Sequence, residues 1–226
     1  MLNSNLNGEY LFAGINTDVR PIGDFSDPGS EAKAKFDEAF FDHFGFSQTD
    51  PAASGITAAA MEDFLTTVVE PQFLGDGWKE NWSNATDERI VTRIATNETA
   101  ETSVTANVEG VRKLMMVATT VSDLLAGPLN EAARGALYER ALTLVGEGLA
   151  DLGDVQAQAG VAENRISDAS ERISTQVDLF RKFVTDLEGV DPYEASTRVT
   201  DLLTQIEASY TLTARIQQLS LVRFLP

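Results

Sequence analysis

The chain has 226 residues, enough for one large domain or two small ones, and its 43% of hydrophobic residues permits a packed core. With 35 acidic and 17 basic residues its formal net charge is −18, which argues against partners such as nucleic acid or an anionic membrane, because both are bound through Lys and Arg. The absence of cysteine excludes disulfides, thiolate catalysis and cysteine-based metal sites, and no stretch reaches the roughly 18 continuous apolar residues of a membrane span.

The first structural signal is "NGEYLFAG". Asn7-Gly8 is typical of a tight turn, and the residues after it suit a strand. Only six residues precede the turn, so we expect nothing upstream in this chain to pair with that strand. We expect Tyr10 and Phe12 to pack on a hairpin or on the nearby helical core, and Gly14 to lead out of it.

Residues 16–106 predict a mixed α/β region of short elements. The run "EAKAKFDEAFFDHFGF" predicts a helix, because four phenylalanines recur at spacings that suit one face: Phe36, Phe40, Phe41 and Phe44. The run "GITAAAMEDFLTTVVEPQF" predicts a second helix, which Pro71 ends. "LGDGWKENWSNATDE" is typical of a loop, whereas "RIVTRIAT" and "TSVTANVE" predict two short strands.

From Val108 onward the pattern is helical almost to the end of the chain. "EGVRKLMMVATTVSDLLAG" predicts a helix closed by Gly127-Pro128. A second, long helix is predicted around 136–189, where apolar residues recur every three or four positions. This predicted seam consists of Leu142, Val145, Leu149, Leu152, Val155, Ala159, Ala162, Ile166, Ala169, Ile173, Val177, Phe180, Val184 and Leu187.

The length of that helix indicates a rod or an assembly. At 1.5 Å per residue, some 50 residues would reach roughly 75 Å, too long for a compact domain of this size. Gly146, Gly148, Gly153 and Gly160 each lower helix propensity by about 1 kcal/mol relative to Ala. We therefore expect the helix to depend on partners for its stability.

The last helix is expected to begin at a clear capping signal. Asp191 suits the N-cap, Pro192 the first helical position, and Glu194 the capping box. The tail "LSLVRFLP" is apolar in an otherwise acidic chain, which predicts an interface for an absent partner.

A search for catalytic constellations favours structural explanations. His43 is the only histidine and is expected to be a partly exposed helix residue. Glu80, Asp87 and Glu88 near Trp78 and Trp82 could line a two-carboxylate sugar cleft, but loop acids and buried tryptophans explain the same residues. No phosphate-binding loop and no G-x-S-x-G motif occurs. We expect no enzyme, cofactor or metal site.

Several segments resemble the bacterial flagellin and hook-associated protein family. "NGEYLFAG" resembles the point where the ascending helices of that family end, and "DVQAQAGVAENRI" resembles its long descending helix. "NWSNATDERIVTRIATNETAETSVTANVEGVRKL" is similar to the stretch that re-enters the helical core. The ending "ARIQQLSLVRFL" resembles the hook–filament junction members (the third hook-associated protein) at least as much as flagellin. Residues 21–77 carry no resemblance. Family members have N-terminal helices before "NGEYLFAG", so the resemblance implies that this chain lacks its N-terminal helical region.

The residues and the resemblance together give the following expectations. The fold is mainly α with a mixed α/β insert, a long coiled-coil-like helical rod plus a small, variable middle domain. The expected regions are 1–15 with 107–191 as the rod, 16–106 as the middle domain and 192–226 as an axial helix. The assembly interface is predicted at Leu202, Leu203, Ile206, Ile216, Leu219, Val222 and Phe224.

The expected function is that of an extracellular structural subunit of the flagellum that connects hook to filament for motility. The implied partners are hook-associated protein, flagellin, further copies in a ring, and an export chaperone on the C-terminal helix. The resemblance implies export by the flagellar secretion apparatus without a cleaved signal peptide. Two alternatives remain: flagellin itself, and a non-flagellar coiled-coil adaptor. An enzyme within 16–106 is the weakest reading.

Overall fold

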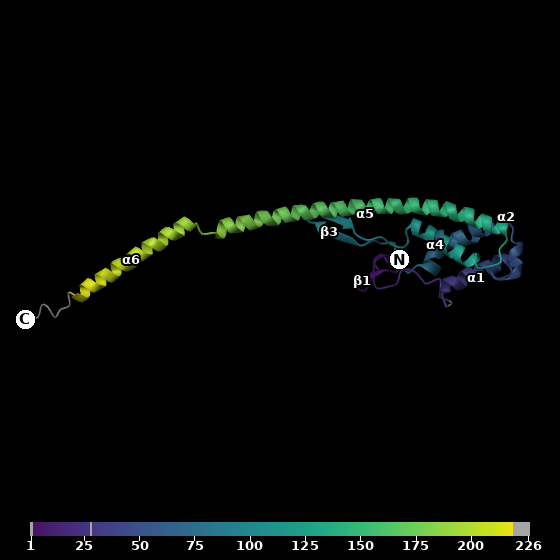
Figure 1. Ribbon diagram of the computed structural model, residues 1–226, viewed down its shortest axis with the longest axis horizontal. Helices are drawn as coiled ribbons and strands as arrows, with labels where there is room; N and C mark the ends of the chain where they lie inside the picture. The colour runs from purple at the N-terminus through teal and green to yellow at the C-terminus, as the bar shows by residue number, and fades with distance from the viewer. Residues whose placement is uncertain (1, 28, 219–226) are drawn as a thin grey trace, which may run out of the picture. The chain divides into compact units, whose positions relative to one another are not determined.

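The computed structural model describes residues 2–27 and 29–218, and this part of the chain is mainly helical with two small two-stranded sheets (Figure 1). The predicted fold class, mainly α with a small mixed α/β part, is confirmed. The chain forms two compact units, Met1–Ser170 and Glu171–Pro226. The three regions expected from the sequence do not coincide with these two units, and they stay a prediction.

The elements follow one another along the chain as short pieces and then long helices. The first part contains β1 (Asn5–Leu6), β2 (Glu9–Tyr10), α1 (Glu31–Phe44), the 3₁₀-helix η1 (Pro51–Gly55), α2 (Ala58–Phe64), the π-helix η2 (Leu65–Val69), α3 (Glu70–Leu74) and the π-helix η3 (Trp78–Trp82). The second part contains β3 (Val91–Ala95), β4 (Glu98–Glu101), α4 (Glu109–Leu124), α5 (Glu131–Glu188) and α6 (Pro192–Gln218).

The N-terminal segment is a hairpin in its own right. β1 pairs antiparallel with β2 around Asn7 and Gly8, whose φ angles of 55° and 91° are those a two-residue hairpin turn requires. The expectation that nothing upstream pairs with the strand was wrong, because two residues before the turn suffice for this pairing. Phe12 is partly buried against the core, and its carbonyl accepts a hydrogen bond from the Ala106 backbone N–H at 2.8 Å.

Aromatic side chains form the core of the first unit. Phe36 and Phe40 of α1 are fully buried and make edge contacts with Phe64 of α2. Ser30 caps α1 by accepting a hydrogen bond from the Lys33 N–H, so the predicted helix is confirmed. Phe41 is 55% exposed, which corrects the expectation that all four phenylalanines share one covered face.

The helix that includes Pro71 continues past it, contrary to the prediction. η2 is a π-helical segment that joins α2 to α3, and Pro71 lies in the first turn of α3, where a missing N–H is tolerated. The segment ends at Gly75, where an added Cβ would lie 2.5 Å from the Pro71 carbonyl oxygen. The predicted loop 74–88 also contains a helical turn, η3, which places Trp78 and Trp82 in the core.

The second hairpin lies earlier in the sequence than predicted. β3 matches "RIVTRIAT", but its partner β4 is Glu98–Glu101 and lies outside "TSVTANVE". A short turn after Ala95 brings Val91 opposite Glu101, so pairing occurs before the predicted second strand begins. The segment after β4 bonds to other parts of the unit through Thr105 and Ala106.

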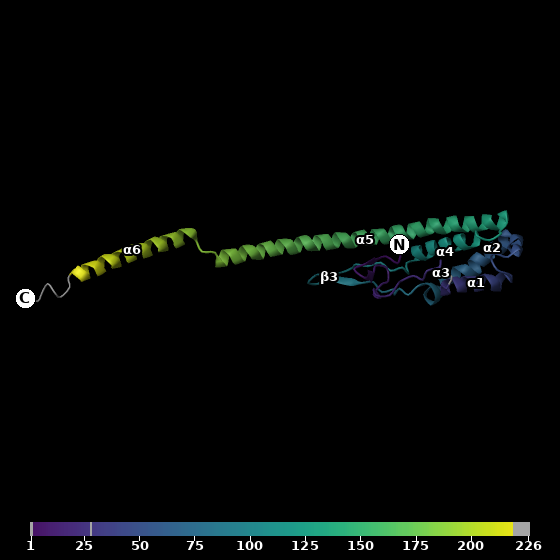
Figure 2. The ribbon, with the colours of Figure 1, turned by 60° about the horizontal axis from the view of Figure 1, so that its bottom comes forward.

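α4 and the long α5 confirm the two predicted helices, and α5 is a continuous helix of 58 residues. α4 lies beside the N-terminal part of α5 in both ribbon views (Figures 1 and 2). The covered face of α5 differs from most of the predicted seam: Leu142 and Leu149 are 73% and 59% exposed, whereas Ala169 of the seam is buried. The buried positions are Ala133, Leu137, Ala141, Leu144, Gly148 and Ala169.

Candidate assembly surface

α6 exposes its apolar side chains along the whole described helix. None of its residues is buried. Val199, Leu202, Leu203, Ile206 and Tyr210 recur at spacings of three and four residues, with Leu202 and Leu203 adjacent, which places them on one side of the helix. The exposed large apolar residues of α6 are Tyr193, Val199, Leu202, Leu203, Ile206, Tyr210, Leu212 and Ile216.

The predicted interface residues lie within this surface as far as the structure describes them. Leu202 and Leu203 are each 56% exposed, Ile206 is 48% exposed and Ile216 is 63% exposed. Leu219, Val222 and Phe224 lie outside the described residues. Val199 and Tyr210 share the face of Ile206, and the same periodicity could have added them to the predicted set.

The end of α5 that belongs to the second unit has a similar surface. From Glu171 to Glu188 every residue is exposed, although apolar side chains recur as in a coiled-coil seam. The large apolar residues in this stretch are Ile173, Val177, Leu179, Phe180, Phe183, Val184 and Leu187. We use "assembly surface" below for these residues together with the exposed apolar residues of α6.

In the first unit, by contrast, α4 covers part of α5, and the two helix backbones come very close to each other at Gly110 and Gly148. A Cβ on Gly110 of α4 would lie 2.7 Å from the carbonyl oxygen of Gly148 on α5. A Cβ on Gly148 would lie 3.2 Å from the carbonyl oxygen of Gly110 and from Leu114. A side chain at Gly110 would therefore collide with the α5 backbone, and Gly148 lies in a tight contact with α4 that explains it without an outside partner.

Lys113 of α4 joins the same two helices electrostatically. Its side chain is 10% exposed, and its Nζ lies 2.9 Å from Asp151, 3.1 Å from Glu109 and 3.3 Å from Glu147. The hydrogen bond to Asp151 raises the pKa of Lys113 above its ordinary value. Burial opposes this shift, and the hydrogen bonds to Glu109 and Glu147 add to it. The ammonium group is thus held charged between α4 and α5.

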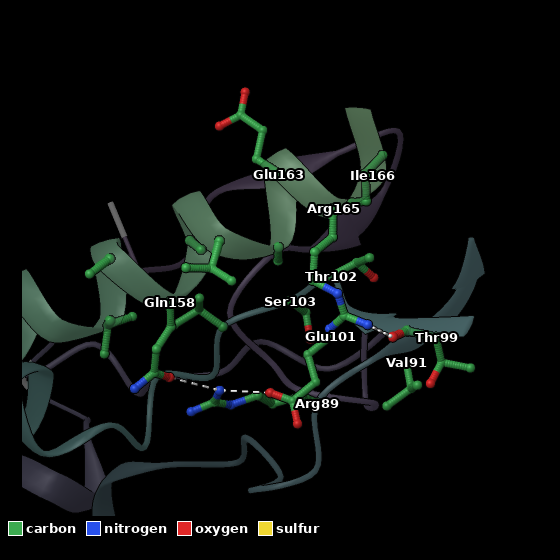
Figure 3. Close-up of a pocket in the computed structure, with 16 residues that line it drawn as sticks. Arg89, Val91, Thr99, Glu101, Thr102, Ser103, Gln158, Glu163, Arg165 and Ile166 are labelled. Carbon is green, nitrogen blue, oxygen red and sulfur yellow. Dashed lines mark hydrogen bonds and ion pairs between the residues drawn. The ribbon is translucent and has the colours of Figure 1, made fainter. Parts of the chain in front are cut away.

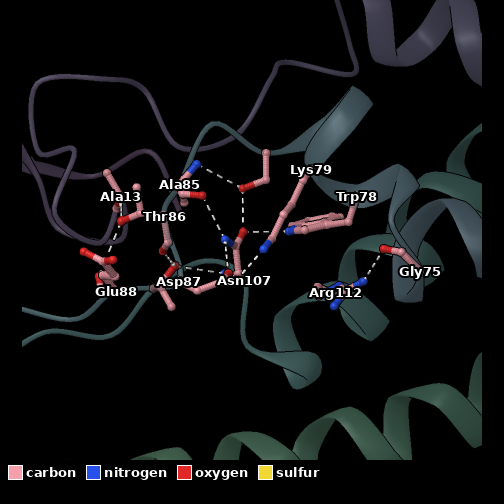
Figure 4. A network of polar contacts seen from close by, with 12 residues as sticks. Ala13, Gly75, Trp78, Lys79, Ala85, Thr86, Asp87, Glu88, Asn107 and Arg112 are labelled. Carbon is pink, nitrogen blue, oxygen red and sulfur yellow. Dashed lines mark hydrogen bonds and ion pairs between the residues drawn. The ribbon is translucent and has the colours of Figure 1, made fainter.

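Asn107 organises the base of the second hairpin (Figure 4). Its Oδ1 accepts hydrogen bonds from Trp78 Nε1 at 2.7 Å and Ser83 Oγ at 2.6 Å, and its Nδ2 donates to the Ala85 carbonyl at 2.9 Å and to Asp87 at 2.8 Å. Hydrogen bonds from Lys79 and then Asn107 lower the pKa of the Asp87 carboxyl. No pattern in the sequence indicates this role of Asn107.

The residues considered for a sugar cleft are explained by this packing. Trp78 and Trp82 are buried, and Trp82 stacks against Phe25 and makes a tilted contact with Phe73, so their rings are not open to a sugar. Lys79 forms an ion pair with Asp87. These contacts support the structural reading of the tryptophans.

His43 lies at the edge of the aromatic core. Its ring packs against Phe44 and Phe64, and its Nε2 is 3.8 Å from Asp63. Within residues 2–27 and 29–218 no group of three or more acidic or histidine side chains could hold a metal ion. In the same part of the chain, no helix has the length and apolar character to cross a membrane.

A groove of about 900 Å³ lies between the β3–β4 hairpin and α5 (Figure 3). Apolar residues line both sides: Val91 and Val104 belong to the hairpin region, and Val155, Ala162 and Ile166 belong to α5. Two arginines reach across it: Arg89 donates to Gln158 of α5 at 3.3 Å, and Arg165 of α5 donates to the Thr99 carbonyl at 3.0 Å. The groove belongs to the first unit, and none of the residues considered from the sequence as catalytic lines it.

Comparison with known proteins gives one match. Residues 142–225 match the family model for the bacterial flagellin C-terminal helical region. No curated protein and no solved structure matches the chain. The matched residues include most of α5 and all of α6, the part of the chain that carries the assembly surface. Flagellin is a structural, non-enzymatic family whose members self-assemble into extracellular filaments. The match makes this C-terminal part of the chain similar to the helical region of flagellin.

Proposed function

We propose that the protein is a hook–filament junction subunit, which connects the flagellar hook to the filament. The observation that carries this proposal is the assembly surface. Although the chain is strongly acidic, it leaves a long row of apolar side chains exposed on α5 and α6. Exposed apolar rows of this length are typical of surfaces that another chain covers. The resemblance of "ARIQQLSLVRFL" to junction proteins favours this subunit over flagellin itself.

In this proposal α6 is an axial helix that packs its apolar side against neighbouring subunits. Its partners are hook-associated protein, flagellin and further copies of the chain in a ring. Before assembly an export chaperone covers the same apolar side, and the flagellar secretion apparatus exports the subunit without a cleaved signal peptide. Leu202, Leu203, Ile206 and Ile216 would bury their side chains in these contacts, as would Leu219, Val222 and Phe224, which lie outside the described residues.

The test replaces two residues of the assembly surface in the protein as cells produce it. Leu203→Asp with Ile206→Asp places two charges on the apolar side of α6, so incorporation into the flagellum should be lost and cells should lose motility. Thr204→Asp with Thr211→Asp adds the same charges on the opposite, exposed side and should leave incorporation intact. Normal motility of the first variant would refute the role of α6.

The position of the labelled protein separates the junction from its alternatives. A few copies at the boundary between hook and filament support the proposal. Many copies along the filament indicate flagellin, and absence from the flagellum indicates a coiled-coil adaptor.

A further inference from the structure

We propose that in the free chain α6 folds back on the end of α5, so that the two helices form an antiparallel hairpin that covers much of the assembly surface. The proposal concerns the described residues 171–218 of the second unit. It goes beyond the proposed function, because it names what covers this surface before any other protein does. It does not depend on which protein covers the surface later.

The connection between the two helices has the length of a helix-hairpin loop. Only Gly189, Val190 and Asp191 separate α5 from α6. The Gly189 N–H donates to the Thr185 carbonyl at 2.7 Å, which closes the last turn of α5. Asp191 accepts a hydrogen bond from the Tyr193 N–H at 2.8 Å and so caps the start of α6. Antiparallel helices are typically joined by loops of about 2–5 residues, so this connection permits the chain to reverse.

Each helix presents one row of exposed apolar side chains. Within each row the spacing is three or four residues, which places the members on one side of their helix. The α5 row consists of Ile173, Val177, Phe180, Val184 and Leu187. The α6 row consists of Val199, Leu202, Leu203, Ile206 and Tyr210.

The two rows come level with each other when the chain reverses at Val190. Both helices rise about 1.5 Å per residue, so residues equally far from Val190 in the sequence lie at the same height in such a hairpin. The pairs that then lie level, to within one residue, are Val177 with Leu203, Phe180 with Val199, and Ile173 with Ile206. Apolar side chains therefore meet apolar side chains along both rows, as in other packed helix pairs.

Closure removes the two rows from water without burying the nearby charges. Removal of apolar surface from water favours the hairpin. Asp178, Lys182 and Asp201 lie on the outer sides of their helices, away from the rows, and stay in water. Two packed helices open locally more easily than the aromatic core of the first unit, so α6 remains less protected than α4. Assembly then competes with closure for the same apolar side chains.

A distance measurement on the free chain tests the hairpin, because the chain has no cysteine of its own. Spin labels at Ser174→Cys and Ser209→Cys lie on the two helices, outside both rows. If α6 continues in the direction of α5, the labels are about 50 Å apart, since each residue adds about 1.5 Å. In the hairpin they lie within about 30 Å, since packed helix axes are about 8–10 Å apart. We expect mostly short distances, and a distribution with long distances alone would overturn the proposal.

Two neighbouring substitutions separate row contact from other causes. Phe180→Asp places a charge in the α5 row and should shift the ratio of short to long distances at least about tenfold toward long distances. Leu179→Asp, at an exposed apolar residue on another side of the same helix, is the matched control and should leave the ratio unchanged. An equal response of both variants contradicts closure through the rows.

Dilution separates the hairpin from pairing between two copies. The doubly labelled chain is mixed with an excess of unlabelled chain, so that contacts between copies no longer bring two labels together. The short distance should persist in this mixture, because both labels belong to one chain. Its disappearance would mean that α6 packs against a second copy, and the hairpin would be refuted.

Discussion

At Gly110 and Gly148 the backbones of α4 and α5 meet without a side chain between them. The other glycines of α5 behave differently: a Cβ on Gly146, Gly153 or Gly160 would have no atom within 4 Å beyond the helix itself. The same residue type therefore has two roles in one helix. One position allows close packing, and the others only lower the helix propensity.

Alanine substitutions should separate these roles. Gly110→Ala should lower the free energy of unfolding by about 1–3 kcal/mol, because its methyl group would collide with the Gly148 carbonyl. Gly153→Ala should raise it by about 0.5–1 kcal/mol, since an exposed helical position gains propensity. Urea denaturation followed by circular dichroism measures both. Equal effects of the two substitutions would contradict the assigned contact.

At the scale of elements, α4 and α5 are joined by an ion cluster as well as by close packing. Lys113 faces three carboxylates, of which two belong to α5. The side chain has little contact with water, so its charge is compensated inside the helix pair. Elsewhere α5 meets the short helices through the ion pair of Arg140 with Glu70.

Lys113 should make stability depend on alkaline pH. Its pKa in the folded chain lies above the ordinary 10.5, so its stabilisation is complete below about pH 10.5 and is lost as the pH rises through the folded pKa. Lys113→Met should cost about 1–2 kcal/mol at pH 7, because the three carboxylates lose their counter-ion but remain partly exposed.

The measurement compares urea midpoints at pH 7 and pH 11. The difference between the unmodified chain and Lys113→Met should be smaller at pH 11. Lys35→Met, at a solvent-exposed pair with Glu38, is the matched control and should change the midpoint little at pH 7. A constant difference across this range would show that Lys113 does not titrate with folding.

At the scale of the whole molecule, the two units differ in how their helices are stabilised. The first unit has an aromatic core and buried helix faces, whereas α6 in the second has no buried residue. Isolated helices gain little from propensity alone, so tertiary packing normally supplies most of their stability. In the described residues 171–218, the second unit therefore consists of long helices whose side chains are all left exposed.

Hydrogen exchange should show this difference directly. Backbone amides of α6 should exchange faster by at least about 100-fold than those of α4, whose packed face ties their opening to unfolding of the core. Exchange followed by mass spectrometry on the free chain measures both helices in one experiment. Equal protection in the monomeric chain would mean that α6 is stable without a partner.

The sequence by itself determined the mainly helical fold, the length of α5, the start of α6 and the apolar side of α6. These features depend on local signals: residue spacing, the Asp191 cap with Pro192, and the lack of interrupting prolines. The tertiary structure decided which face of α5 is covered, where β4 pairs, and that Pro71 lies within a helix. Each of these depends on contacts between distant residues, such as Gly110 with Gly148 and Trp78 with Asn107, and local periodicity contains no information about such contacts.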